Sequence, residues 1–115
     1  MAARYDITIE QGSTFVFDLE VTGVDLSSGY TARMQGRTSH AATSTTFSLT
    51  NGSGITISYS AGNSHLVPTL TATATTAMTA PSSGVYDLEY EHTASGVVTR
   101  ILEGTYYITP EVTRA

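Results

Sequence analysis

Three carboxylates, Asp87, Glu89 and Glu91, alternate with apolar side chains in the segment 86–91. Alternate residues of a β-strand share one face, so neighbouring carboxylates would lie roughly 6.5–7 Å apart on one side of it. Paired acids at such distances serve glycoside hydrolysis, and carboxylate oxygens are ligands for calcium. This trio is therefore the first candidate for a catalytic or calcium site.

An ion-paired strand face is the favoured interpretation of these acids. Like charges on one strand cost energy unless cations on a neighbouring strand oppose them. If the chain forms a hairpin that turns at 94–96, Arg100 lies roughly opposite Glu91 or Glu89. We therefore predict that arginine neutralises the trio, with calcium binding less favoured and catalysis least favoured.

The remaining reactive residues form no recognisable site. His40, His65 and His92 lack the local spacing of zinc ligands. The chain has no cysteine, and the nucleophile pattern Gly-x-Ser-x-Gly does not occur. Ser64 precedes His65, but adjacent strand residues point to opposite faces. We predict no catalytic residue, no metal site, no cofactor and no enzymatic activity.

Composition narrows the classes of partner. The formal net charge is -5 and all five basic residues are arginine, which argues against nucleic-acid binding because phosphates need clustered cations. No apolar run approaches a membrane span, and the N-terminus lacks the apolar region of a signal peptide. The charged fraction of 13% is about half of the usual roughly 25%. Such a surface suits a protein that contacts other subunits, although an ordinary neutral β domain fits equally well.

Alternation with a period of two predicts β-strands along the whole chain. The clearest predicted strands are 14–21, 55–59 and 86–91, and weaker ones are 6–10, 30–35, 46–49, 65–74 and 97–109. Pro68 suggests an edge strand or a bulge, and Gly104 suggests a bulge or a change of sheet. One helical turn is predicted at 75–79. Tyr106 and Tyr107 are adjacent, so they must face opposite sides.

Turn residues separate these strands at regular intervals. They lie at 11–13, 24–29, 51–54, 61–63, 81–84 and 94–96, and Asn51-Gly52 suits a primed hairpin turn. We predict an all-β protein: a single antiparallel β-sandwich of about seven to eight short strands, immunoglobulin-like or related, with at most one short helical turn. One domain spans 1–115, with extended arms at 1–4 and 110–115.

Several segments resemble a known group of proteins. These are 6–12, 15–19, 24–37, 84–89, 96–104 and 108–114. They resemble small phage and prophage proteins encoded among tail and fibre genes. The chain is also similar, more distantly, to the N-terminal β-sandwich domain of upper baseplate proteins of tailed phages, in which an aspartate-leucine-(Thr/Ser)-Gly turn leads into a strand. The motifs are structural, and no catalytic residue comes with them.

The resemblance implies a virion structural protein that acts as an attachment module in the tail, baseplate or fibre. Its partners would be other virion proteins in multiple symmetric copies, with no nucleic acid and no membrane, after assembly in the host cytoplasm. A capsid decoration protein is the alternative, and a carbohydrate- or calcium-binding host-contact module is a further one. The candidate interface residues are Arg33, Arg37, Arg100, Tyr107 and Arg114, because guanidinium groups bond bidentately and stack, and an outward tyrosine needs a partner to bury it.

Overall fold

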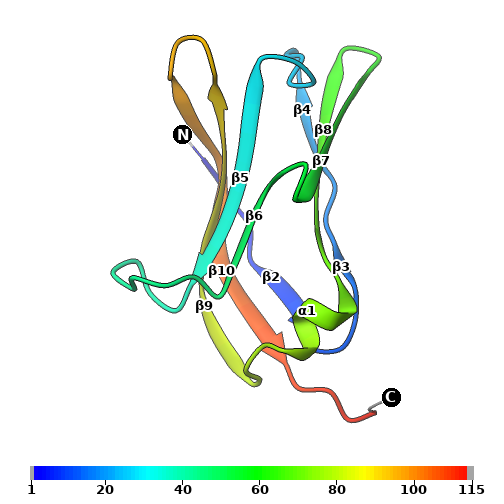
Figure 1. Ribbon diagram of the computed structural model, residues 1–115, viewed down its shortest axis with the longest axis vertical. Helices are drawn as coiled ribbons and strands as arrows, with labels where there is room; N and C mark the ends of the chain where they lie inside the picture. The colour runs from blue at the N-terminus through cyan, green and yellow to red at the C-terminus, as the bar shows by residue number, and fades with distance from the viewer. Residues whose placement is uncertain (1, 114–115) are drawn as a thin grey trace.

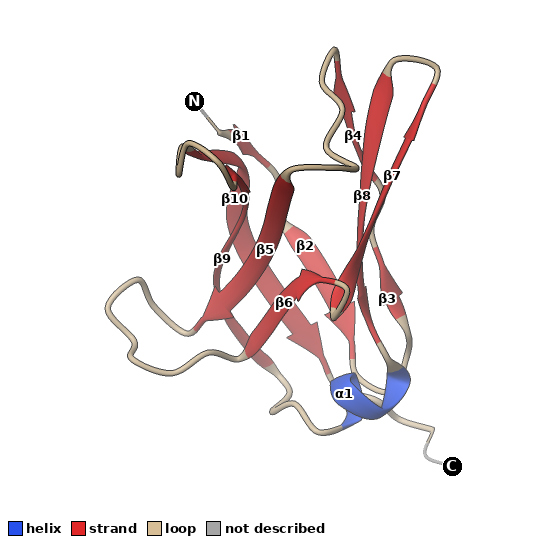
Figure 2. Cartoon of the chain, turned by 45° about the horizontal axis from the view of Figure 1, so that its top comes forward, coloured by secondary structure: helices blue, strands red, loops and turns tan. Residues whose placement is uncertain are grey.

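The computed structural model describes residues 2–113, in which ten strands curl into two facing layers (Figures 1 and 2). The prediction of an all-β sandwich with one short helical turn is confirmed. The elements are β1 (Ala3–Arg4), β2 (Ile7–Glu10), β3 (Phe15–Val16), β4 (Leu19–Thr22), β5 (Tyr30–Arg37), β6 (Phe47–Asn51), β7 (Gly54–Ser60), β8 (Asn63–Leu70), α1 (Ala72–Thr76), β9 (Ser82–His92) and β10 (Val98–Thr109). No helix in this range has the length and apolarity needed to cross a membrane.

The front layer runs β1/β2, β10, β9, β5, β6, and the back layer runs β7, β8, β3/β4. Most neighbours are antiparallel, as predicted. Three contacts are parallel instead, because β1 and β2 both pair with β10 in parallel and β6 meets β7 in parallel. The two layers therefore belong to one continuous, mixed sheet that turns from front to back at β6 and β7.

The core lies between the layers and follows the predicted alternation. Successive residues of β2, β5, β8 and β9 alternate between buried and more exposed positions. The buried apolar side chains include Ile7, Ile9, Ala32, Met34, Phe47, Leu49, Ile55, Leu66, Leu70, Tyr86, Leu88, Leu102, Tyr106 and Ile108. The chain has no cysteine, so the two layers are held together by the burial of apolar side chains and not by a disulfide.

Pro68 divides the strand predicted at 14–21 into β3 and β4. Both pieces pair with β8 in one unbroken register, since Phe15 lies opposite Leu70 and Leu19 opposite Leu66. The gap comes where Phe17 donates its N–H to the Pro68 carbonyl at 3.1 Å. Proline has no N–H to return the bond, so the ladder is interrupted there. The prediction that Pro68 marks an edge strand is wrong, because β8 has strand partners on both sides.

The helical turn lies at 72–76, three residues before the predicted 75–79, and the strand predicted at 65–74 ends at Leu70. Thr71 caps the helix, because its side-chain oxygen accepts a hydrogen bond from the Ala74 N–H. The hydroxyl of buried Thr75 accepts from the Gly12 N–H at 3.0 Å. Threonine favours strands in general, so capping and a tertiary contact overrode the local preference here.

Gly104 is a point of close backbone approach, and the predicted bulge lies elsewhere. The register of β10 shifts between Arg100 and Leu102. A side chain at Gly104 would place its Cβ 2.2 Å from the Tyr5 carbonyl oxygen. That carbonyl also accepts a hydrogen bond from the Tyr86 hydroxyl, and burial raises the pKa of Tyr86 to about 12. Position 104 therefore requires glycine, because any larger residue would collide with the N-terminal segment where it passes β10.

The hairpin turns differ from prediction at one position. A tight turn does form at Asn51-Gly52, because Thr50 and Ser53 exchange backbone hydrogen bonds at 2.9 and 3.1 Å around it. It is not a primed turn, because φ is positive at Gly52 and not at Asn51; the Asn51 side chain accepts from the Ala32 N–H at 3.1 Å instead. The turn with positive φ at two adjacent residues joins β7 to β8 at Ala61 and Gly62, with φ of 53° and 85°. The predicted turn at 94–96 is confirmed, since it joins antiparallel β9 and β10.

The predicted arms are partly tied to the sandwich. Ala3–Arg4 forms β1 on the edge of β10. Beyond β10, the Glu111 N–H donates to the Gln11 side chain at 3.1 Å. Met1 and residues 114–115, which belong to the predicted arms, lie outside the described residues.

Replacing Ala61 should stabilise the protein. In the left-handed region the Cβ of a residue such as alanine costs about 1–2 kcal/mol. Glycine avoids this cost because it has no Cβ, and asparagine offsets it because its side chain can hydrogen-bond locally. We expect Ala61→Asn to raise the melting temperature by about 2–6 °C, measured by thermal unfolding. Ala94→Asn is the matched control, because φ at Ala94 is not positive. An equal shift in both variants would show that the Ala61 backbone carries no strain.

Candidate interaction surface

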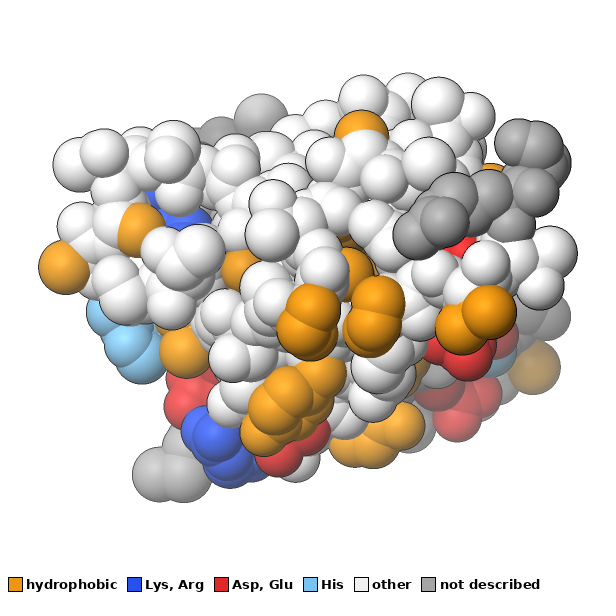
Figure 3. All heavy atoms as spheres, turned by 90° about the horizontal axis from the view of Figure 1, so that it is seen from below, with side chains coloured by type: hydrophobic (Ala, Val, Ile, Leu, Met, Phe, Trp, Pro, Cys, Tyr) orange, Lys and Arg blue, Asp and Glu red, His pale blue; other side chains and the backbone are white. Residues whose placement is uncertain are grey.

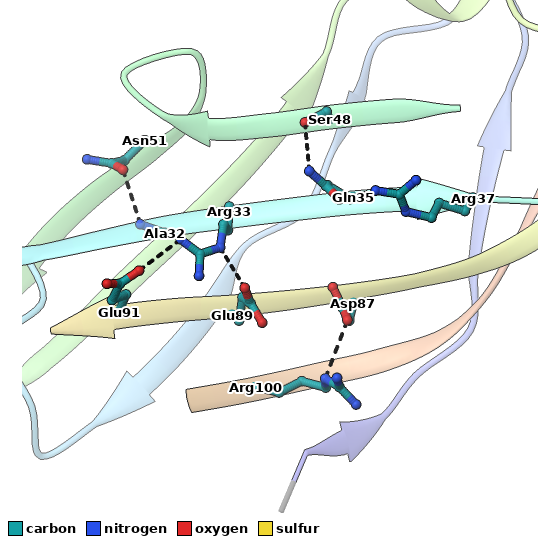
Figure 4. Close-up of polar contacts among 10 residues, drawn as sticks. All are labelled: Ala32, Arg33, Gln35, Arg37, Ser48, Asn51, Asp87, Glu89, Glu91 and Arg100. Atoms are coloured by element: carbon teal, nitrogen blue, oxygen red, sulfur yellow. Dashed lines mark hydrogen bonds and ion pairs between the residues drawn. The ribbon is translucent and has the colours of Figure 1, made fainter. Parts of the chain in front are cut away.

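The outward side of β5, β9 and β10 gathers charged side chains from three adjacent strands (Figure 4). We call this surface the arginine face, and its residues are Arg33, Gln35, Arg37, Asp87, Glu89, Glu91, Arg100, Glu103 and Tyr107. The inward residues of the same strands fill the core. Alternation therefore separates the two sets without any help from loops.

Arg33 holds two of the three predicted acids. Its guanidinium lies 2.6 Å from a Glu89 carboxylate oxygen and 3.0 Å from one of Glu91, as Figure 4 shows. Arg33 faces Glu89 directly across the β5–β9 ladder. Hydrogen bonds to Glu89 and then Glu91 raise the pKa of the Arg33 guanidinium. The acids thus form an ion-paired strand face, as the sequence predicted, although it suggested Arg100 as the partner.

Arg100 pairs with different acids from those predicted. Its backbone does lie opposite Glu89 in the ladder, as expected. Its side chain instead lies 3.4 Å from Asp87 and 3.3 Å from Glu103. Glu89 is already engaged by Arg33 from the other side, so Arg100 reaches the acid that remains. Alternation in 30–35 was the available signal for Arg33, but only the strand order places that segment beside β9.

Asp87 is partly buried beside two other acids. Burial raises its pKa, and the charges of Glu89 and Glu103 add to this, while Arg100 opposes it. Its side chain remains 38% exposed. Its environment therefore disfavours the charged form, although the ion pair with Arg100 is formed.

Arg37 has neutral partners only. Its guanidinium donates to the Ala42 carbonyl and to the Gln35 side chain, both at 3.0 Å, and it forms no ion pair within residues 2–113. It lines a cleft of about 360 Å³ together with Arg4, His40, Val85, Tyr86, Asp87, Arg100, Glu103, Gln35 and Gly104. Arg37 brings to this cleft a guanidinium without a carboxylate partner among residues 2–113.

Four of the five candidate interface residues belong to this one face. Arg33, Arg37 and Arg100 come from β5 and β10, and Tyr107 of β10 is 48% exposed. Tyr106 is fully buried, so the two tyrosines do face opposite sides. Arg114 lies outside the described residues. The structure thus brings together residues that are up to 74 positions apart in sequence.

The other reactive side chains lie elsewhere. His65 contacts Asp18 at 3.0 Å and Glu20 at 3.6 Å on the back layer. His92 is hydrogen-bonded to Ser95 at 2.8 Å. Over residues 2–113 no group of three or more His, Asp or Glu side chains has an arrangement that could hold a metal ion. His65 and His92 therefore each contact side chains of their own neighbourhood and take no part in the arginine face.

Asp25 closes the turn at 24–29 that leads into β5. Its carboxylate accepts hydrogen bonds from the Ser27 N–H at 2.9 Å and the Ser27 hydroxyl at 2.5 Å. These bonds lower the pKa of Asp25. Leu26 then packs into the core, and its N–H donates to the hydroxyl of buried Ser64. The turn therefore has a structural role, as the sequence predicted.

No protein-family model matches this chain, and no curated protein matches it. Among solved structures, it is similar to the extracellular domain of the voltage-gated sodium channel beta4 subunit. The two are 11% identical over 97% of this chain and 96% of that one, with a TM-score of 0.46. That protein forms parallel homodimers and acts in cell–cell adhesion. At this level of similarity neither function nor partners carry over to this chain.

Removing the Arg33 guanidinium should destabilise the sandwich. Arg33→Met leaves the half-buried Glu89 and Glu91 facing each other without a cation, and we expect a loss of about 1 kcal/mol in the free energy of unfolding. Denaturant titration measures it. Adding Glu89→Gln to Arg33→Met should recover part of the loss. Arg100→Met is the control and should cost less, because its side chain is 54% exposed.

Ionisation of Asp87 and of Asp25 should change the stability of the fold in opposite directions. The pKa of Asp87 is raised above 3.8 in the folded state, so its ionisation costs stability as pH rises through that pKa. The pKa of Asp25 is lowered, so its charge adds stability that is lost as pH falls below 3.8. Melting temperatures across pH should show Asp87→Asn above the wild type at neutral pH and Asp25→Asn below it. Both differences should vanish in acid, and the same sign for both variants would contradict this account.

Proposed function

We propose that this chain is a non-enzymatic attachment module of a tailed-phage virion, which docks onto neighbouring tail, baseplate or fibre proteins through the arginine face. The observation that carries the proposal is the gathering of Arg33, Arg37, Arg100 and Tyr107 on the outward side of three adjacent strands. The particle itself comes from the sequence resemblance, which spans nearly the whole chain.

The arginine face has properties that suit a protein interface. Arginine and tyrosine are enriched where proteins meet, and other charges are depleted there. Arg33 and Arg100 are already held by carboxylates, so little side-chain freedom remains to be lost on binding. Arg37 has no such carboxylate, so an acidic side chain of a partner can pair with it in the cleft. A surface of ion-paired side chains with Arg37 available in a cleft fits docking better than catalysis.

The acid trio does not favour the alternatives in which it binds calcium or hydrolyses sugars. Glu89 and Glu91 contact Arg33, and Asp87 contacts Arg100. A cation or a substrate would have to displace a guanidinium from each. A capsid decoration protein would use the same kind of surface, so the position on the particle separates it from the tail.

The test is the location of this chain in particles of the phage or prophage that encodes it. We expect a map of the intact particle to place it in the tail, with a dozen or so copies related by symmetry. Hundreds of copies on the head, or its absence from the particle, would overturn the proposal.

A charge-reversal variant tests whether incorporation into the particle depends on the arginine face. Arg37→Glu should abolish incorporation into particles while the purified variant keeps its melting temperature. Thr56→Glu is the matched control, because it adds negative charge at an exposed position of β7 in the back layer. Normal incorporation of the Arg37→Glu variant would show that the cleft is not the contact.

A further inference from the structure

An apolar groove opens between β6 and α1, at the end of the sandwich where the helix lies (Figure 1). Its volume is about 660 Å³, and its apolar lining consists of Phe47, Leu49, Leu70, Ala74, Ala77, Met78 and Tyr106. Figure 3 views the molecule from this end and shows hydrophobic side chains gathered on it. The groove is separate from the arginine face, since β6 and α1 form its walls.

One wall of the groove is an incompletely paired strand. Residues Phe47 to Thr50 of β6 pair with β5 on one side. On the other side β6 meets β7 only at Thr50 and Asn51. Over Phe47–Leu49 the second edge therefore has no strand partner within residues 2–113. Such an edge accepts an added extended segment, and an adjoining apolar groove takes alternate side chains of that segment.

The segment 110–113 has the complementary properties. It follows β10 without joining a strand, and its Val112 is 93% exposed. Its start is held near the groove, because Glu111 is bonded to Gln11 and the Gln11 side chain donates to the carbonyl of Met78, which lines the groove. Val112 is therefore a large apolar side chain left in solvent beside an apolar groove that it does not enter in its own chain.

We propose that two copies of this chain associate end to end, and that each places its segment 110–113 in the groove of the other. The groove and the segment lie at the same end of the molecule, where the segment follows β10 near α1 (Figure 1). A two-fold axis at that end would therefore place each chain's segment in the other chain's groove at the same time. Two-fold symmetry is the commonest arrangement of homodimers. Val112 would contact the apolar lining, and the backbone of the segment would extend along the edge of β6. The inference does not depend on the phage assignment.

Sedimentation velocity of the purified chain over a concentration series tests the proposal. We expect a monomer–dimer equilibrium, and a monomer at every concentration would overturn it. Val112→Asp should raise the dimer dissociation constant by about tenfold or more, because the buried valine is replaced by a charge. Val97→Asp is the matched control: Val97 is 60% exposed and belongs to the β9–β10 turn at the opposite end (Figure 1).

A second variant blocks the groove without touching the core. Ala74 is an exposed helical residue that lines the groove, so Ala74→Arg should weaken the dimer. Thr73→Arg on the same helix is exposed and outside the lining, so it should not. Both variants keep the core and should keep the wild-type melting temperature of the monomer.

Mixing the Ala74→Arg and Val112→Asp variants distinguishes a dimer that exchanges segment 110–113 from a dimer of any other kind. An Ala74→Arg chain retains an intact segment, and a Val112→Asp chain retains an intact groove. Their mixture should form a heterodimer through one good contact, tighter than either variant alone. A dimer that both substitutions leave unchanged, or a mixture no tighter than its components, would overturn the exchange.

Discussion

The register of β9 between β5 and β10 is the constraint on which both faces of the front layer depend. Leu88 lies opposite Met34 on one side and Leu102 on the other, and all three are buried. The same register sends Asp87, Glu89 and Glu91 outward. A slip of one residue would turn three carboxylates into the core. Hydrophobic burial and ion pairing therefore select the same alignment, and each supports the other.

Charge on the arginine face is distributed unevenly. Arg33 forms ion pairs with two acids, and so does Arg100. Arg37 donates hydrogen bonds to neutral oxygens only. Three guanidiniums and four carboxylates leave the arginine face with one excess negative charge, and Arg4 at its edge pairs with Asp6. Most of the net charge of -5 therefore lies outside this surface. A surface close to neutrality can be buried against a partner at lower electrostatic cost than a strongly charged one.

Side-chain oxygens replace backbone partners where the sheet changes direction. Asn51 accepts from the Ala32 N–H beside the junction of β6 and β7, and Asp6 accepts from the Thr105 N–H between β1 and β2. Thr71 does the same for the helix after β8. These short polar residues satisfy N–H groups that no strand can reach. Side-chain acceptors thus take up backbone donors at three places where the strand ladder is interrupted.

The amino-acid sequence by itself determined the local features: the alternation, the all-β class, the turn at 94–96, and the opposite faces of Tyr106 and Tyr107. It also indicated that the acid trio would be neutralised by arginine. These follow from the period of two, which any strand shows whatever its neighbours are. The tertiary structure alone decided that β5 lies beside β9, so that Arg33 rather than Arg100 holds Glu89. It also decided that β6 and β7 run parallel after Asn51-Gly52, and that Pro68 lies between two partners. Strand neighbours are contacts between distant parts of the chain, and a local pattern of residues does not specify them.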